Sequence, residues 1–131
     1  MIDFRQKESD WKKSMDIIMQ NVNLSKINIL DNVTMVFEFL NSYDGADHKK
    51  IICNSVWKLS SEIDLSMGNE FPIFVCDIRL RKLENDDVKP AFEYYGFGLM
   101  ISELTEYYLL CIESGEVSIN IICESIEVSD M

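Results

Sequence analysis

Hydrophobic residues near the N-terminus recur with the period of an α-helix. The apolar residues that would share one helical face are Trp11, Met15, Ile18, Met19 and Val22. Residues at such spacings lie above one another on a helix, and Ser9 is suited to cap its start. The pattern therefore predicts an N-terminal amphipathic helix whose apolar stripe packs on the core.

After residue 25 the apolar period shortens to two, which is the period of a β-strand. The strands predicted in this way cover residues 26–30, 33–40, 51–59, 71–83, 97–102, 106–113 and 116–128. The residues that would share the apolar face of the fourth strand are Phe74, Cys76, Ile78 and Leu80. A change of apolar parity near Asn54 and Ser55 predicts a bulge in the third strand.

A short second helix is predicted at about 86–95, because Asp86 or Asp87 would cap it and Pro90 suits its first turn. The order of elements is then helix, four strands, helix, three strands, without regular βαβ spacing. We therefore expect an α+β fold, a mostly antiparallel sheet of about six to seven strands with the N-terminal helix and the short helix packed on it. The chain has no repeat or linker, so residues 1–131 are expected to form a single domain.

A β-hairpin is predicted around the Ser-Gly pair at 114–115. If these two residues form the turn, Ile112 faces Val117 and the apolar pairs share the core face. Cys111 and Cys123 then fall on opposite faces of the sheet, because successive side chains alternate along a strand. This register excludes a metal site or a disulfide that those two cysteines would share.

The cysteines and the histidine do not form a recognisable site. The cysteines are Cys53, Cys76, Cys111 and Cys123, at wide spacings, and His48 is the single histidine. Zinc ligands usually come in closely spaced pairs, so we expect no metal and instead expect buried, reduced thiols. Glycine-rich phosphate loops and nucleophile motifs are also missing from the sequence. We therefore expect no cofactor and no catalytic residue, which favours a protein that is not an enzyme.

The charge is strongly negative and unevenly distributed. The formal net charge is −11, and residues 90–131 contribute −8 because they hold eight acids and no Lys or Arg. Such a field disfavours nucleic acid and anionic membranes and attracts cationic proteins. We therefore expect a basic protein partner, no nucleic acid and no membrane. The alternative is that the acidic side chains serve only solubility.

The predicted partner-binding surface is centred on the last hairpin. In the predicted register Glu113 faces Glu116, and a cationic partner would turn this repulsion into attraction. Tyr107 would supply an aromatic anchor of the kind that interfaces favour. The full set of predicted partner-binding residues is Glu103, Glu106, Tyr107, Glu113, Glu116, Glu124 and Glu127.

Arg79, Arg81 and Lys82 form a compact basic group on the predicted fourth strand. Three interpretations stay open: the group pairs with the acidic surface, binds a phosphate, or covers a solvated strand face.

No apolar run approaches the roughly 18 residues of a membrane helix, and the first residues, MIDFRQKESDWKK, lack the apolar core of a signal peptide. We expect a soluble cytoplasmic protein, either a monomer or a weak dimer.

The general plan of the chain resembles that of a known class of inhibitors. The stretches that carry the resemblance are DWKKSMDIIM, KIICNSVWKL, FPIFVCDIRLRKL and YYLLCIESGEVSINIICESIEV. In this plan the chain resembles the immunity proteins of bacterial polymorphic-toxin systems of the contact-dependent inhibition type. The resemblance implies a stoichiometric inhibitor that covers the active site of a basic toxin, such as a nuclease domain, and it carries over no individual functional residue.

Two other functions stay open. One is a small ligand-binding or enzymatic domain with a pocket between the sheet and the N-terminal helix, near Trp11 and Trp57. The other is an assembly module that pairs through an exposed edge strand.

Overall fold

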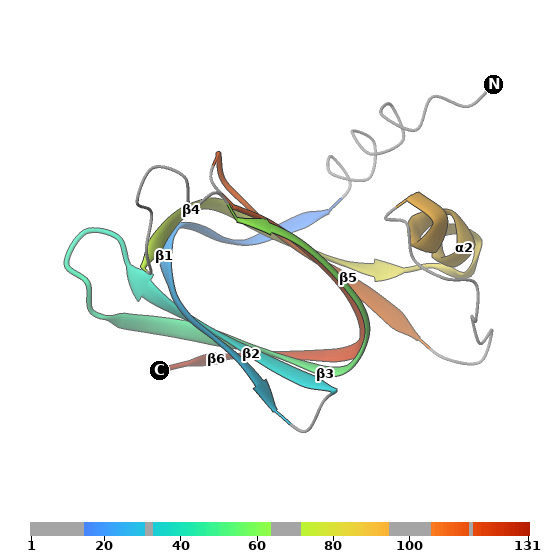
Figure 1. The fold of residues 1–131 in the computed structure, drawn as a ribbon, viewed down its shortest axis with the longest axis horizontal. Helices are drawn as coiled ribbons and strands as arrows, with labels where there is room; N and C mark the ends of the chain where they lie inside the picture. The colour runs from blue at the N-terminus through green and yellow to red at the C-terminus, as the bar shows by residue number, and fades with distance from the viewer. Residues whose placement is uncertain (1–14, 31–32, 64–71, 95–105, 116) are drawn as a thin grey trace.

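A computed structural model describes residues 15–30, 33–63, 72–94, 106–115 and 117–131. The elements in chain order are β1 (Asp16–Leu30), β2 (Thr34–Asn41), β3 (Asp47–Ile63), β4 (Ile73–Leu83), α2 (Asn85–Tyr94), β5 (Tyr107–Glu113) and β6 (Val117–Asp130). The six strands close into an antiparallel barrel in the order β1-β2-β3-β6-β5-β4, and β4 pairs back to β1 (Figure 1). Two three-stranded meanders, β1-β2-β3 and β4-β5-β6, thus meet at the β3–β6 and β1–β4 ladders.

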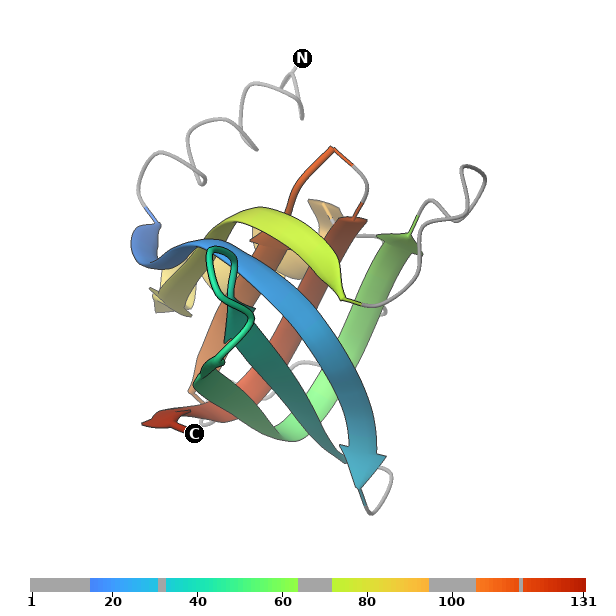
Figure 2. The ribbon, with the colours of Figure 1, turned by 90° about the vertical axis from the view of Figure 1, so that its left-hand side faces the viewer.

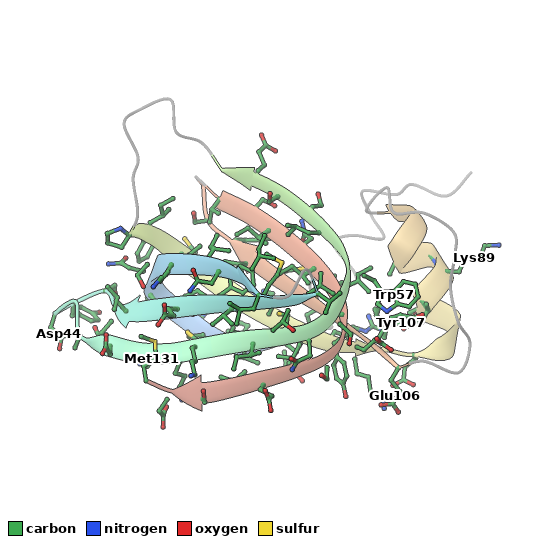
Figure 3. All side chains as sticks on the ribbon, turned by 60° about the horizontal axis from the view of Figure 1, so that its bottom comes forward. Asp44, Trp57, Lys89, Glu106, Tyr107 and Met131 are labelled. Carbon is green, nitrogen blue, oxygen red and sulfur yellow. The ribbon has the colours of Figure 1, made fainter. Side chains whose placement is uncertain are left out.

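Alternating apolar residues fill the inside of the barrel. On β2, Met35, Phe37 and Phe39 are buried while their neighbours along the strand are partly exposed, as the period of two predicts. The interior cluster consists of Met19, Val22, Leu24, Met35, Phe37, Phe39, Ile51, Cys53, Ile73, Val75, Ile78, Leu110, Ile112, Val117, Ile119, Ile121 and Cys123. Side chains therefore occupy the space that the ribbon encloses (Figure 3). Burial of these residues supplies the main favourable term in folding.

Asn21 on β1 and Ser55 on β3 have an unusual backbone conformation. These are the two long strands at which the meanders meet. Both residues have φ of 53°, in the left-handed region that non-glycine residues rarely adopt. Near Ser55 the inward parity of β3 changes, because Cys53 and Val56 both pack in the interior cluster although they lie three residues apart. A register shift follows between Val56 and Lys58. The bulge predicted near Asn54 and Ser55 is therefore confirmed.

A second, smaller apolar cluster lies outside the barrel, between α2 and the outer face of β4, β5 and β6 (Figure 1). Its members are Met15, Leu83, Val88, Ala91, Tyr107, Leu109, Cys111 and Ile122. The Arg81 guanidinium on β4 also forms an ion pair with the Asp87 carboxylate on α2. The short helix expected at about 86–95 is present, and it packs on the sheet.

The predicted α+β class is wrong, because the described part of the chain is almost entirely antiparallel strand. The N-terminal amphipathic helix is contradicted over residues 16–22, which belong to β1. The bend at Asn21 explains the error: Met19 and Val22 both face inward three residues apart, which imitates helical spacing. The predicted N-cap and Trp11 lie outside the described residues, as does the strand predicted over 97–102.

The apolar face predicted for the fourth strand is also wrong. Ile73, Val75 and Ile78 point inward, whereas Phe74 and Cys76 are exposed. The parity of β4 changes opposite the bend in β1, so one alternating face cannot extend along the whole strand.

The final hairpin has a different register from the predicted one. Ile112 pairs with Ile119 instead of Val117, and the Ser114 N–H donates to the Val117 carbonyl at 2.8 Å, so the hairpin closes at Ser114 and Val117, one residue later than predicted. A shift of two preserves the faces. Cys111 consequently lies in the outer cluster and Cys123 in the interior cluster, which confirms that they fall on opposite faces.

Candidate functional site: an acidic strand edge

The C-terminal half of β6 forms an acidic edge of the barrel. The β5–β6 ladder ends at the Tyr108–Cys123 pair, whereas the β3–β6 ladder continues to Asp130. Among the described strands, residues 124–130 therefore pair only with β3. We call this segment, which carries Glu124, Glu127 and Asp130, the acidic edge.

Two lysines neutralise part of the negative charge near this edge. Lys49 Nζ lies 2.7 Å from Asp130 Oδ1, and this hydrogen bond and charge lower the pKa of Asp130. At the start of β5, Lys82 Nζ lies 3.0 Å from Glu106 Oε1, and the Glu106 carboxylate raises the pKa of Lys82. Both pairs are solvent-exposed, so water and salt weaken them.

Glu124 and Glu127 make no ion pair with any cation in the part of the chain that the structure describes. Glu127 is exposed and stands opposite Ile52 on β3, while Glu124 is half-buried. The charge that remains available on the acidic edge is therefore concentrated on these two carboxylates.

Glu113 lies at the opposite end of the β5–β6 hairpin. It pairs with Ser118 on β6 and with Asp77 on β4. Asp77 accepts hydrogen bonds from Gln20 Nε2 at 3.0 Å and from Arg79 Nη2 at 3.5 Å. The sequence did not identify Asp77 as a neighbour of Glu113, because the proximity depends on the β4–β5 pairing.

The predicted acidic surface is thus divided into two places. Glu113 is level with Ser118, which lies six residues before Glu124 on β6. At the usual rise of a strand this separation is about 20 Å. Glu106 and Glu124 lie at one end of the β5–β6 ladder, and Glu113 lies at the other.

Tyr107 does not belong to the exposed surface. It is fully buried in the outer cluster beneath α2, and its ring meets that of Trp57 edge to face, with centroids 5.7 Å apart and an interplanar angle of 80° (Figure 3). The predicted role of Tyr107 as an exposed anchor is therefore wrong. Glu103 and Glu116 lie outside the described residues, so the structure does not place them.

The basic group on β4 is paired with acids. Arg79, Arg81 and Lys82 form ion pairs with Asp77, Asp87 and Glu106, respectively. Pairing with the predicted acidic surface is therefore borne out for Lys82 alone, because Asp77 and Asp87 lie outside that surface. Arg81 therefore links β4 to α2, and Lys82 links β4 to the residue before β5, whereas Arg79 pairs within β4.

The cysteines have no described metal partners. No group of three or more His, Cys, Asp or Glu side chains that could hold a metal ion occurs among the described residues. None of the four cysteines forms a disulfide, and Cys76 is the exposed one. A hydrogen bond with the Cys123 thiol, together with burial, raises the pKa of Cys53, which keeps that thiol protonated.

In the described residues, no helix has the length and apolar character needed to cross a membrane.

A family model matches residues 17–130 under the description "-like:-like", which states no activity, ligand or partner. A crystal structure of an uncharacterized protein from Neisseria gonorrhoeae is similar to this chain, with a TM-score of 0.64 and 21% identity. The match covers 89% of this chain and 98% of the other, and at that identity it shows the fold alone. No match was found among curated proteins.

Proposed function

We propose that this chain, which belongs to the family whose model matches residues 17–130, is a non-enzymatic binding protein. Its acidic edge docks a basic partner protein. In this proposal the partner is a toxin domain, such as a nuclease, and binding inhibits it as an immunity protein would. The protein acts in the cytoplasm, where its four cysteines, which form no disulfide, stay reduced.

The observation that carries the proposal is the position of Glu124 and Glu127 on a strand that has a described neighbour on one side only. A basic partner can bring Lys or Arg side chains to both carboxylates from the side that β5 leaves open. Attraction between such patches speeds association and selects partners of the opposite charge. Because Glu127 is exposed, the interaction would weaken as salt concentration rises.

The filled barrel favours binding over catalysis. The alternative function required a pocket between the sheet and an N-terminal helix, but residues 16–22 of that helix are strand. The described interior is packed with apolar side chains, and Trp57 rests against Tyr107. Binding at the acidic edge therefore has more support in the described residues than a pocket between the sheet and an N-terminal helix.

The first test measures binding of a fluorescent ten-lysine peptide at low and at moderate salt. Glu124→Gln/Glu127→Gln removes the two carboxylates that have no ion pair among the described residues, and Asp16→Asn/Glu38→Gln is the matched control, since it removes the same charge from other strands. We expect the first variant to lose roughly tenfold or more in affinity, while the control stays near wild type. Equal losses in both variants would mean that only net charge matters and would refute docking at the acidic edge.

The inhibitory role needs a separate test. If a toxin-like reading frame lies beside the gene, its product should stop growth when expressed alone, and the wild-type protein should restore growth in co-expression. The Glu124→Gln/Glu127→Gln variant should restore it less well than the control variant. If the wild-type protein binds the product but gives no protection, the immunity role is wrong even though docking is right.

A further inference from the structure

The second half of β3 forms another strand edge that has no neighbour on one side among the described strands. Unlike the acidic edge, it carries apolar residues and charges of both signs. The β2–β3 ladder covers only the start of β3, and its last pair is Met35–Cys53, followed by a hydrogen bond from the Val56 N–H to the Val33 carbonyl. Residues 57–63 continue beside β6 as far as the Ile63–Val117 pair. Among the described strands they have a neighbour on that side only. In Figure 2 this half of β3 is the green strand at the right of the ribbon.

The apolar residues on this edge are incompletely covered. Leu59 stands opposite Ile121, which points into the barrel and is fully buried, yet Leu59 itself is 41% exposed. Trp57 is 37% exposed although one side of its ring rests against Tyr107. Exposed apolar side chains on an unpaired strand are the usual sign of a surface at which another strand adds.

The sequence of the segment, WKLSSEI, carries opposite charges at equal distances on either side of its central residue, Ser60. When two copies align antiparallel about Ser60, position 58 of each copy stands opposite position 62 of the other. Lys58 would therefore face Glu62 twice, once on each side of the two-fold axis. Positions 58 and 62 belong to the same face, since their β6 partners, Ile122 and Ser118, are both on the outer side of the sheet. Opposite charges at directly facing positions stabilise a strand pair.

We propose that residues 57–63 of β3 pair antiparallel with the same segment of a second copy of this chain, and that they form a two-fold dimer with a sheet continuous across both barrels. The symmetry is isologous, because the same surface of each copy contributes. The exposed part of Leu59 would then lie beside Ser61 of the second copy.

Charge disfavours the same kind of self-association at the acidic edge, because residues 124–130 carry three acids and no base. Antiparallel alignment of residues 124–130 about Glu127 sets Glu127 against Glu127 and Glu124 against Asp130 of the second copy. Like charges at all of these pairs repel. Self-association is therefore directed to β3, and the acidic edge stays available in the dimer.

Sedimentation analysis of charge-swap variants tests the dimer. A single edge pair buries less surface than a standard interface, so we expect wild type to pass from monomer to dimer in the range of roughly 10 µM to 1 mM. Lys58→Glu and Glu62→Lys each replace two attractions by two repulsions, and we expect each to weaken the dimer by roughly tenfold or more. The double variant restores both attractions and should dimerise as wild type does.

A second measurement tests the alignment itself. In a Cys76→Ser background, Ser60→Cys places two thiols opposite each other on the two-fold axis, and copper–phenanthroline should cross-link them into a covalent dimer on a non-reducing gel. Ser125→Cys, on the acidic edge, is the matched control and should remain monomeric. A monomeric wild type up to 1 mM, a double variant as weak as the single ones, or equal cross-linking at positions 60 and 125 would each overturn the proposal.

Discussion

Adjacent leucines on β5 provide a direct test of the two-sided packing. Leu110 is 0% exposed inside the barrel, and Leu109 is 1% exposed beneath α2. Changing either residue to Ala removes about three carbons, worth about 2.4 kcal/mol of transfer free energy at about 0.8 kcal/mol each. A cavity term adds to this loss and depends on how far the surroundings can collapse.

The cavity term should differ between the two sites. Strands surround Leu110 and restrain one another, so Leu110→Ala should cost about 3.5–5 kcal/mol, near the top of the usual range. Leu109 lies in the smaller cluster that α2 shares with the outer face of the sheet, and a short helix is less restrained than a strand, so Leu109→Ala should cost about 2.5–3.5 kcal/mol. Urea denaturation with an unchanged m-value gives both free energies of unfolding. Should wild type prove too unstable for Ala at these sites, Leu→Val at both positions supplies the same comparison.

A double-mutant cycle identifies which leucine contacts the helix. Val88→Ala on α2 should couple to Leu109→Ala by about 0.5 kcal/mol or more, because the two side chains share the outer cluster. It should be additive with Leu110→Ala, which lies on the other face of the sheet. Coupling to Leu110 in place of Leu109, or a cost below about 1 kcal/mol for Leu109→Ala, would refute the packing of α2 on the outer face.

Three further outcomes follow from local geometry. Ser55→Gly should be neutral or stabilising by up to about 1 kcal/mol, because relief of the left-handed strain outweighs the backbone entropy of Gly, whereas Ser55→Val should destabilise in thermal melts. Lys49→Met should raise the pKa of Asp130 in an NMR titration. A carboxyl whose pKa is lowered by folding adds stability that is lost as the pH falls through that pKa, so the variant should lose less stability than wild type on acidification. Cys76 should react quickly with a disulfide reagent, whereas Cys53 should react only on unfolding, and a fast phase that persists in Cys76→Ser would contradict this assignment.

Strand residues that run straight through one part of the barrel were predictable from sequence. The alternation of Met35, Phe37 and Phe39 on β2 corresponds to the observed inward face. The hairpin faces were also predictable although the position of the turn was not, because a register error of two residues leaves every side chain on the same side. Local periodicity therefore identifies the face of a strand even where it misjudges the pairing.

Bent strands were not predictable in this way. At Asn21 the left-handed backbone lets inward residues follow one another at a spacing of three, and periodicity alone cannot distinguish this from a helix. The same bend divides the apolar face of β4, so Phe74 becomes exposed while Ile78 is buried. Barrel closure needs such corners, and the residues that form them here are Asn and Ser, which carry no glycine signal.

The candidate site was predictable in its charge but not in its location. Counting charges identified the acidic C-terminal segment, and Glu124 and Glu127 remain its unpaired carboxylates among the described residues. Which strand sides lie open depends on where each ladder ends, and no local pattern encodes that. The burial of Tyr107 likewise depends on the outer cluster and on the Trp57 ring, which are contacts between distant segments.

The two strand edges that have no neighbour among the described strands differ in charge pattern, and this difference separates the two proposals. The acidic edge repels its own copy and suits a cationic partner, while residues 57–63 balance Lys58 against Glu62 and suit a second copy. Raising the salt concentration weakens both interactions, so salt alone cannot distinguish them. Charge reversal can, because Glu62→Lys should abolish the dimer and leave the ten-lysine peptide bound, whereas Glu124→Gln/Glu127→Gln should release the peptide and leave the dimer. If either variant abolished both interactions, the edges would not be independent, and the assignment of one partner to each edge would be wrong.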